Sequence, residues 1–108
     1  MKIFITGVAG FLGSHLADLM ISEGHTVAGN DNMIGGYTDN VPQNVEFHQV
    51  DCCDLENMTK AMEGCDIVYH TAATAYEGLS VFSPVLVTRN IFEASVTTIT
   101  AAIRNKVK

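Results

Sequence analysis

The chain has 108 residues, of which 47% are hydrophobic, and this length and composition fit one small domain over residues 1–108. Its net charge of -6 leaves no basic stripe for nucleic acid, and no apolar run approaches the roughly 20 residues that span a bilayer. Because the first residues lead directly into a strand rather than a signal-peptide core, we expect a soluble, cytoplasmic protein without membrane partners.

The first predicted element is a strand over residues 2–6, which runs into a glycine-rich turn. Gly7, Gly10 and Gly13 recur every three residues where this strand gives way to a helix over residues 10–23. We expect the first glycine to form a tight turn, the second to admit a ligand close to the main chain, and the third to let the helix pack on the strand. A diphosphate would meet unpaired N–H groups at the positive end of this helix. The helix should carry an apolar stripe of Leu12, Leu16, Leu19 and Met20.

A second strand is predicted over residues 25–30, and Asp31 follows it directly. Asp31 lies 18 residues beyond Gly13, where an acidic side chain can accept hydrogen bonds from ribose hydroxyls. Residues 32–43 hold several turn-forming residues and predict an exposed loop.

A third strand is predicted over residues 45–50, and Asp54 has the position of an N-cap for a helix that ends at Gly64. Three apolar side chains of that helix should point inward: Leu55, Met58 and Met62. The cysteines are odd in number and form no C-x-x-C pair, so we expect reduced thiols in the core rather than a disulfide or metal site: Cys52, Cys53 and Cys65.

The fourth strand, residues 66–70, is mostly apolar, as expected of a strand covered on both faces. A glycine-containing loop should follow, and then a helix capped by Ser83 with Pro84 at its first position. Residues 96–100 are all β-branched and locally favour a strand. We predict a helix over residues 84–105 because no glycine or proline interrupts it and apolar residues recur at helical spacing: Phe92, Val96, Ile99 and Ile103.

This alternation of strands and helices implies an α/β fold with a parallel sheet. Four features follow one another along the chain, each after a predicted strand: the glycine turn, Asp31, Asp51 and the run His-Thr-Ala-Ala at residues 70–73. In these features the chain resembles the extended short-chain dehydrogenase/reductases, the NAD-dependent epimerases and dehydratases that act on nucleotide sugars. The resemblance implies a Rossmann-like sheet of order 3-2-1-4 with helices on both faces, ending before the family's fifth strand.

The resemblance also implies the parts of an NAD site between strands one and four. The backbone of Phe11 and Leu12 would hold the pyrophosphate, and Asp31 would hold the adenosine ribose. The adenine amino group would meet Asp51 and the main chain of Cys52. The complete implied set is Gly7, Gly10, Phe11, Leu12, Gly13, Asp31, Asn32, Asp51, Cys52, Thr71, Ala72, Ala73 and Asn90.

Several of these residues have simpler interpretations. Asp51 could merely cap the following turn, Asn32 could be an ordinary turn residue, and the alanines at 72 and 73 could be plain core. A histidine such as His70, at a buried strand end, is more often a hydrogen-bonded structural group than a proton carrier. NAD should be preferred over NADP because Asp31 would repel a ribose 2′-phosphate and no Lys or Arg lies between Lys2 and Lys60.

The resemblance further implies a Tyr-x-x-x-Lys pair as the catalytic centre, and none of Tyr37, Tyr69 and Tyr76 has a lysine four residues on. We therefore expect no catalytic residue in this chain, only the NAD-binding part of an epimerase or dehydratase. A stand-alone dinucleotide sensor or scaffold is the main alternative, and a methyltransferase-like domain is a third. We also expect a homo-oligomer, formed through the edge of strand four or through the last helix, with a nucleotide sugar bound only in a full-length context.

Overall fold

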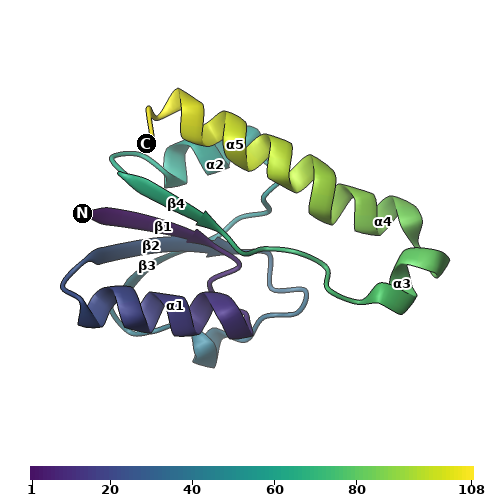
Figure 1. Ribbon diagram of the computed structural model, residues 1–108, viewed down its shortest axis with the longest axis horizontal. Coiled ribbons are helices and arrows are strands. Elements are labelled where there is room, and N and C mark those ends of the chain that lie inside the picture. Colours follow the sequence, from purple (N-terminus) through teal and green to yellow (C-terminus); the bar gives the residue numbers. More distant parts are fainter.

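The computed structural model describes residues 1–108 and contains one four-stranded parallel sheet (Figure 1). The strand order is β3-β2-β1-β4, as predicted, so the order reverses at β1. The strands are β1 (Lys2–Thr6), β2 (Thr26–Asp31), β3 (Val45–Gln49) and β4 (Ile67–His70).

Helices cover both faces of the sheet, which confirms the predicted α/β class. Helix α1 lies on one face, and α2 and α5 lie on the other (Figure 1). A single turn of 3₁₀ helix, η1, interrupts the connection between β2 and β3, and a π-helical turn, η2, joins α4 to α5. The helical elements are α1 (Phe11–Ser22), η1 (Thr38–Asn40), α2 (Leu55–Ala61), α3 (Glu77–Phe82), α4 (Pro84–Thr88), η2 (Arg89–Glu93) and α5 (Ala94–Arg104).

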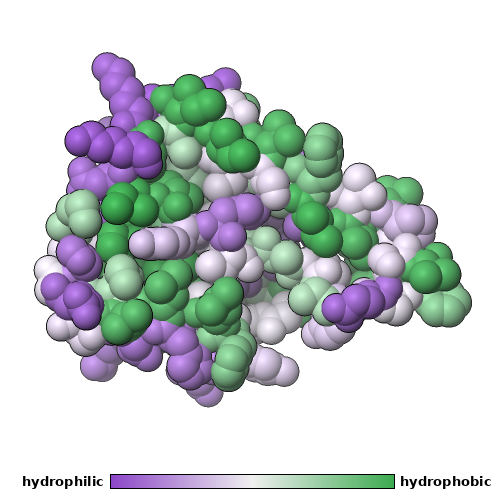
Figure 2. Space-filling view, in the orientation of Figure 1, coloured by the Kyte–Doolittle hydropathy of each residue, from purple (hydrophilic) through white to green (hydrophobic).

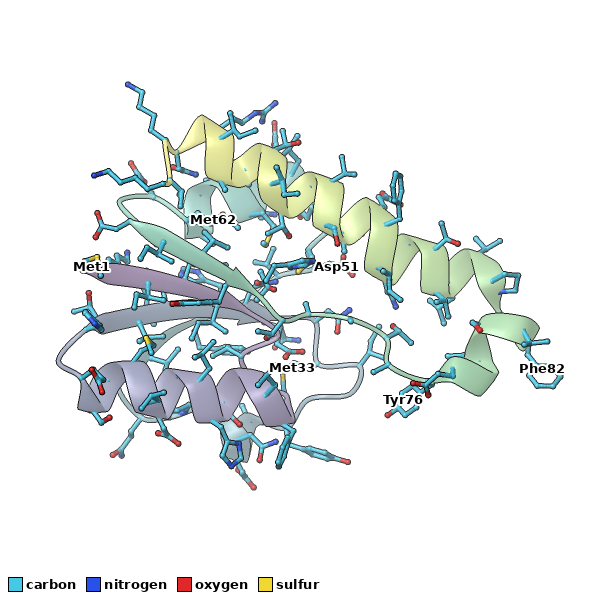
Figure 3. All side chains as sticks on the ribbon, viewed as in Figure 1. Met1, Met33, Asp51, Met62, Tyr76 and Phe82 are labelled. Atoms are coloured by element: carbon cyan, nitrogen blue, oxygen red, sulfur yellow. The ribbon has the colours of Figure 1, made fainter.

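The sheet separates two apolar clusters because successive side chains of a strand point to opposite faces. Ile3 and Ile5 of β1 belong to the cluster under α1, and Phe4 between them belongs to the cluster under α2 and α5. Met58 and Met62 lie fully buried in the second cluster, as predicted. Figure 3 labels Met62 beside α2. Asp54 is the N-cap of α2 and accepts a hydrogen bond from the main chain of Asn57 at 3.2 Å.

The predicted apolar stripe of α1 is only partly correct. The residues buried against the sheet are small, Gly13, Ser14 and Ala17, whereas Leu12 and Leu19 are exposed. The other two residues of the predicted stripe, Leu16 and Met20, are partly buried and pack against the apolar cluster under α1. The glycine turn brings the start of the helix so close to β1 that large side chains do not fit there.

The last third of the chain is helical, as predicted, but its inner face is different from the one expected. Ala94, Thr98 and Ala101 are buried, and they let α5 lie close to α2 and the sheet. The apolar row that the helical spacing identified faces outward: Phe92, Val96, Ile99 and Ile103 are all exposed.

Three further expectations need correction or qualification. The predicted loop before Ser83 contains helix α3, whose N-terminus carries Glu77, a favourable charge at the positive helix end. Ser83 occupies the N-cap position of α4 with Pro84 in its first turn, but its side chain makes no capping bond. Tyr69 and His70, at the end of the edge strand β4, keep exposed surface, although Thr6 and Ser95 partly enclose the His70 ring, so this strand is not fully covered on both faces. No helix has the length and apolar character that crossing a membrane requires.

Candidate functional site

A cleft of about 430 Å³ opens at the carboxyl ends of the strands, within the range of roughly 300–1,000 Å³ typical of small-molecule sites. It lies where the strand order reverses, the usual ligand position in open α/β sheets. Asp51 and Met33, which follow β3 and β2, mark this end of the sheet (Figure 3). Each residue of the predicted cofactor set lines the cleft: Gly7, Gly10, Phe11, Leu12, Gly13, Asp31, Asn32, Asp51, Cys52, Thr71, Ala72, Ala73 and Asn90.

The glycine turn forms one wall of the cleft. Gly7 has a φ of +69°, and a Cβ there would lie 3.0 Å from the Cα of Ala72, so both conformation and space require glycine. The main-chain N–H groups of Phe11, Leu12 and Gly13 have no partner in the chain, and the first turn of α1 holds no acidic side chain. These free donors at a positive helix end form a site suited to an anion such as a diphosphate.

Asp31 joins the glycine turn to the loop that follows β2. Its Oδ2 accepts a hydrogen bond from the main chain of Ala9 at 3.1 Å, and its Oδ1 accepts one from Met33 at 2.9 Å. The side chain is buried but lines the cleft, and each carboxylate oxygen has a further lone pair. The carboxylate can therefore hold the loop in place and still accept hydrogen bonds from a ligand.

The loop over residues 32–43 is fastened above the glycine turn. The main chain of Tyr37 and the side-chain amide of Asn40 both donate to the carbonyl oxygen of Ala9, at 3.2 and 3.1 Å. A Cβ on Gly36 would lie 3.1 Å from both carboxylate oxygens of Asp31, so the loop passes directly over that side chain. The loop thus forms a roof over one end of the cleft.

Asp51 sits in the turn after β3 and is held by three neighbouring groups. Its Oδ1 accepts from the main chain of Cys53 at 2.8 Å, and Asn32 and Arg89 approach its Oδ2 at 3.5 and 3.9 Å. Burial acts to raise the pKa of Asp51, but these hydrogen bonds and the nearby guanidinium outweigh it, so the pKa is lowered. Asp51 therefore both caps its turn and presents a charged carboxylate to the cleft.

The cysteines are free, as predicted, and none is activated. Burial raises the pKa of Cys52, and burial with the adjacent Asp51 carboxylate raises the pKa of Cys53 to about 11. Both thiols are protonated at neutral pH and are poor nucleophiles. No group of three or more His, Cys, Asp or Glu side chains has the arrangement of a metal site.

The wall opposite the glycine turn comes from the segment after β4 and from η2. Asn90 donates from its side-chain amide to Thr74 Oγ1 at 2.9 Å and so connects the two segments. Asn90 belongs to a π-helical turn, a local irregularity that is frequent at functional sites. The predicted residues 71–73 line the cleft, whereas His70 lies beside it and bonds to Thr6 and Ser95.

The sequence prediction missed other residues of the cleft, above all Asn30. Its side chain is fully buried and donates to the carbonyl of Val50 at 2.8 Å and to Cys52 Sγ at 3.3 Å, which fixes the start of the Asp51 turn. Asparagine is depleted in strands, so its presence at the end of a buried strand was the available signal. Gly36 and Thr74 were also missed because only the folding of their loops brings them to the cleft.

A parallel sheet of this order, with a glycine turn and free helix N–H groups where the order reverses, defines the class of Rossmann-like domains. A family model described as the NAD dependent epimerase/dehydratase family matches residues 3–108. The chain therefore belongs to this NAD-dependent family.

Solved structures and curated relatives resemble the chain over much of its length. The UDP-glucose 4-epimerase of Thermotoga maritima, solved with UDP-glucose, superposes with a TM-score of 0.96 at 32% identity, covering 100% of this chain and 36% of that one. The UDP-glucose 4-epimerase of Thermus thermophilus in complex with NAD superposes with a TM-score of 0.93 at 33% identity. This match covers 100% of this chain and 35% of that one. A UDP-N-acetyl-alpha-D-glucosaminuronate decarboxylase of Bacillus cytotoxicus is 28% identical over 99% of this chain and 34% of its own length. The chain thus spans about a third of the length of these relatives.

Proposed function

We propose that this chain is the NAD-binding portion of an epimerase or dehydratase that acts on nucleotide sugars. One observation carries the proposal: three free N–H groups at the start of α1 and the carboxylate of Asp31 belong to residues that line the same cleft. These groups match two adjacent parts of an adenosine diphosphate, the diphosphate anion and the ribose with its hydroxyl donors.

The residues of the cleft divide the work of holding the cofactor. The turn from Gly7 to Gly13 would bind the diphosphate, Asp31 the adenosine ribose, and Asp51 with the Cys52 main chain the adenine. When bound, the nicotinamide supplies a hydride acceptor and donor. The chain has no Tyr-x-x-x-Lys pair, so we propose that it binds the cofactor without turning over a sugar by itself.

The charge of the cleft supports NAD over NADP. Its only charged lining residues are Asp31 and Asp51. The guanidinium of Arg89 approaches Asp51 rather than Asp31, at 3.9 Å. No cation therefore lies beside the Asp31 carboxylate, which we propose binds the ribose, to offset the negative charge of a 2′-phosphate.

Calorimetric titration of NAD and NADP into the purified chain tests this function. Asp31→Ala removes hydrogen bonds to a charged group, worth about 1.5–3 kcal/mol, so the affinity for NAD should fall by at least about tenfold. Asp39→Ala, which removes the same charge from the exposed η1, should leave the affinity unchanged. Absence of NAD binding to the wild-type chain, equal binding by Asp31→Ala, or NADP binding at least as tight as NAD would contradict the proposal.

We also propose that the chain associates with copies of itself. The outward apolar row of η2 and α5 continues along α4 through Val85, and green side chains follow the outer side of these helices (Figure 2). A row of exposed apolar side chains along one side of a helix is typical of an interaction site. The free edge of β4 offers a second surface, because its main-chain groups are unpaired on one side. The nucleotide sugar of the Thermotoga maritima complex supports the same class of substrate for a full-length protein.

A further inference from the structure

His70 lies at the carboxyl end of β4, and both of its ring nitrogens are engaged. Nδ1 is 2.8 Å from Thr6 Oγ1, and Nε2 is 3.0 Å from Ser95 Oγ. The ring therefore bridges β1, at the centre of the sheet, to α5, which covers one of its faces. The hydrogen bonds of the two hydroxyl partners determine which nitrogen carries the proton.

The Thr6 hydroxyl determines the state of Nδ1. Thr6 Oγ1 accepts hydrogen bonds from the main-chain N–H groups of Thr71 at 3.0 Å and Ala72 at 3.1 Å. These two bonds occupy both lone pairs of the hydroxyl oxygen, so its own hydrogen is the remaining group that can bond to the ring. Nδ1 must therefore be the acceptor.

The Ser95 hydroxyl requires the same state from the other side. Ser95 Oγ donates its hydrogen to the carbonyl oxygen of Ile91 at 2.6 Å. It can therefore only accept from the ring, and Nε2 must carry a hydrogen. Two independent partners thus require a neutral imidazole protonated on Nε2.

We infer that His70, as the neutral Nε2–H tautomer, is a positioning residue of the cofactor site, because it orients the Thr6 hydroxyl that holds the Thr71–Ala72 turn against β1. This inference rests on the proposed NAD-binding function. Ala72 lines the cleft, and its Cα would be 3.0 Å from a Cβ on Gly7. A shift of this turn would therefore change the wall that faces the glycine turn.

A second proton on His70 is incompatible with this arrangement. It would place an N–H on Nδ1 against an oxygen whose lone pairs are occupied, and the Thr6 hydrogen would lose its acceptor. The groups that face the ring from β1, from the turn, from η2 and from α5 are hydroxyls, amides and a carbonyl. Burial is the sole cause that lowers the pKa of His70, with no contribution from a charged side chain.

The direction of the pH effect follows from this lowered pKa. The intact turn disfavours the charged ring, whereas a ring released from the turn regains an ordinary pKa near 6.5. Acid therefore favours the released state. The stability of the turn should therefore be greatest above about pH 6.5 and should be lost as the pH falls through the pKa of His70 in the folded protein.

The first test needs no cofactor. Side-chain ¹⁵N spectra of the histidines at neutral pH, with His70 assigned by its loss in His70→Asn, should show the Nε2–H tautomer for this ring. On acidification, the amide signals of Thr71 and Ala72 should shift together with the protonation of His70, and they should not follow that transition in His70→Asn. An Nδ1–H or charged ring at neutral pH, or amide signals that ignore the titration, would overturn the inference.

The second test measures NAD affinity from pH 8 to pH 5. Asparagine at position 70 can present its Oδ1 to Thr6 and cannot titrate, so His70→Asn should bind with near wild-type affinity at pH 8 and lose the acid-dependent decline. His70→Phe, which keeps the ring volume and removes both bonds, should bind several-fold more weakly at every pH. The control is His15→Gln, because the His15 ring bonds to the carbonyl of Phe11, a residue that lines the cleft.

The outcomes of the two tests separate the two proposals. An acid-dependent decline that disappears in His15→Gln and persists in His70→Asn would overturn the positioning role of His70. Wild-type chain that fails to bind NAD at any pH would refute the proposed function, whereas the tautomer and the amide shifts would still decide the role of His70 in holding the turn.

Discussion

Replacing Gly13 by alanine should destabilise the fold even though alanine favours helices. A Cβ on Gly13 would lie 2.2 Å from the carbonyl oxygen of Gly7, and 2.9 Å from the Cα of Val8. These are backbone atoms that cannot rotate away, so we expect the upper end of the overpacking cost of about 1–3 kcal/mol. Alanine recovers about 1 kcal/mol of helix propensity. The net loss is about 2 kcal/mol of unfolding free energy, or a fall in Tm of roughly 8–16 °C.

Gly78→Ala is the matched control for this substitution. Gly78 lies within α3 with no atom within 4 Å of an added Cβ, so the same change should gain about 0.5–1 kcal/mol. Urea unfolding followed by circular dichroism measures both variants against the wild type. Because helix propensity contributes equally to both, equal stability of the two variants would refute the packing argument at Gly13.

Two further predictions concern charge and assembly. Because the pKa of Asp51 is lowered in the folded state, its carboxylate stabilises the fold above its ordinary pKa of 3.8, and this contribution is lost as the pH falls through the lower folded value. Urea unfolding at pH 5 and pH 3 should therefore show a smaller acid-induced loss of stability in Asp51→Asn than in the wild type, and an equal loss would contradict this. Ile99→Asp places a charge on the outward apolar row, so its mass by light scattering should be closer to that of a monomer than the mass of the proposed wild-type oligomer. Leu19→Asp, on the exposed side of α1, should leave the mass unchanged. A wild-type chain that is monomeric at all micromolar concentrations would refute the association, and an oligomer that persists in Ile99→Asp would point to the edge of β4.

The sequence predicted the sheet well because its signals were local and strong. Each strand was a short apolar run bounded by turn residues, and the glycine spacing fixed the position of the first crossover. The ends of the strands carry Asp31 and Asp51, so the parallel order alone predicted that they share a cleft with the glycine turn. The predicted strand order was therefore enough to predict the candidate site.

The errors came where packing distance, rather than periodicity, determines which side of a helix is buried. The large apolar residues of α5 recur at helical spacing, but small residues such as Ala94 and Ala101 face the sheet because this helix lies close to it. Spacing identifies a helical face, and it does not say whether the sheet or another surface covers that face. Asn30 was missed for a similar reason, since its partners Val50 and Cys52 meet it only through the pairing of β2 with β3.

The two hydrogen bonds that Asp31 accepts from the main chain have a consequence for attempts to redesign the cofactor preference. With Asp31 at the ribose, as proposed, a neutral or basic residue in its place would remove the repulsion of a ribose phosphate. The same exchange would leave the N–H groups of Ala9 and Met33 without their acceptor. A successful redesign must therefore supply a substitute acceptor for the roof of the cleft at the same time. Under the proposed function, the Asp31 side chain thus serves both the cofactor preference and the fold of the cleft, and a substitution affects both.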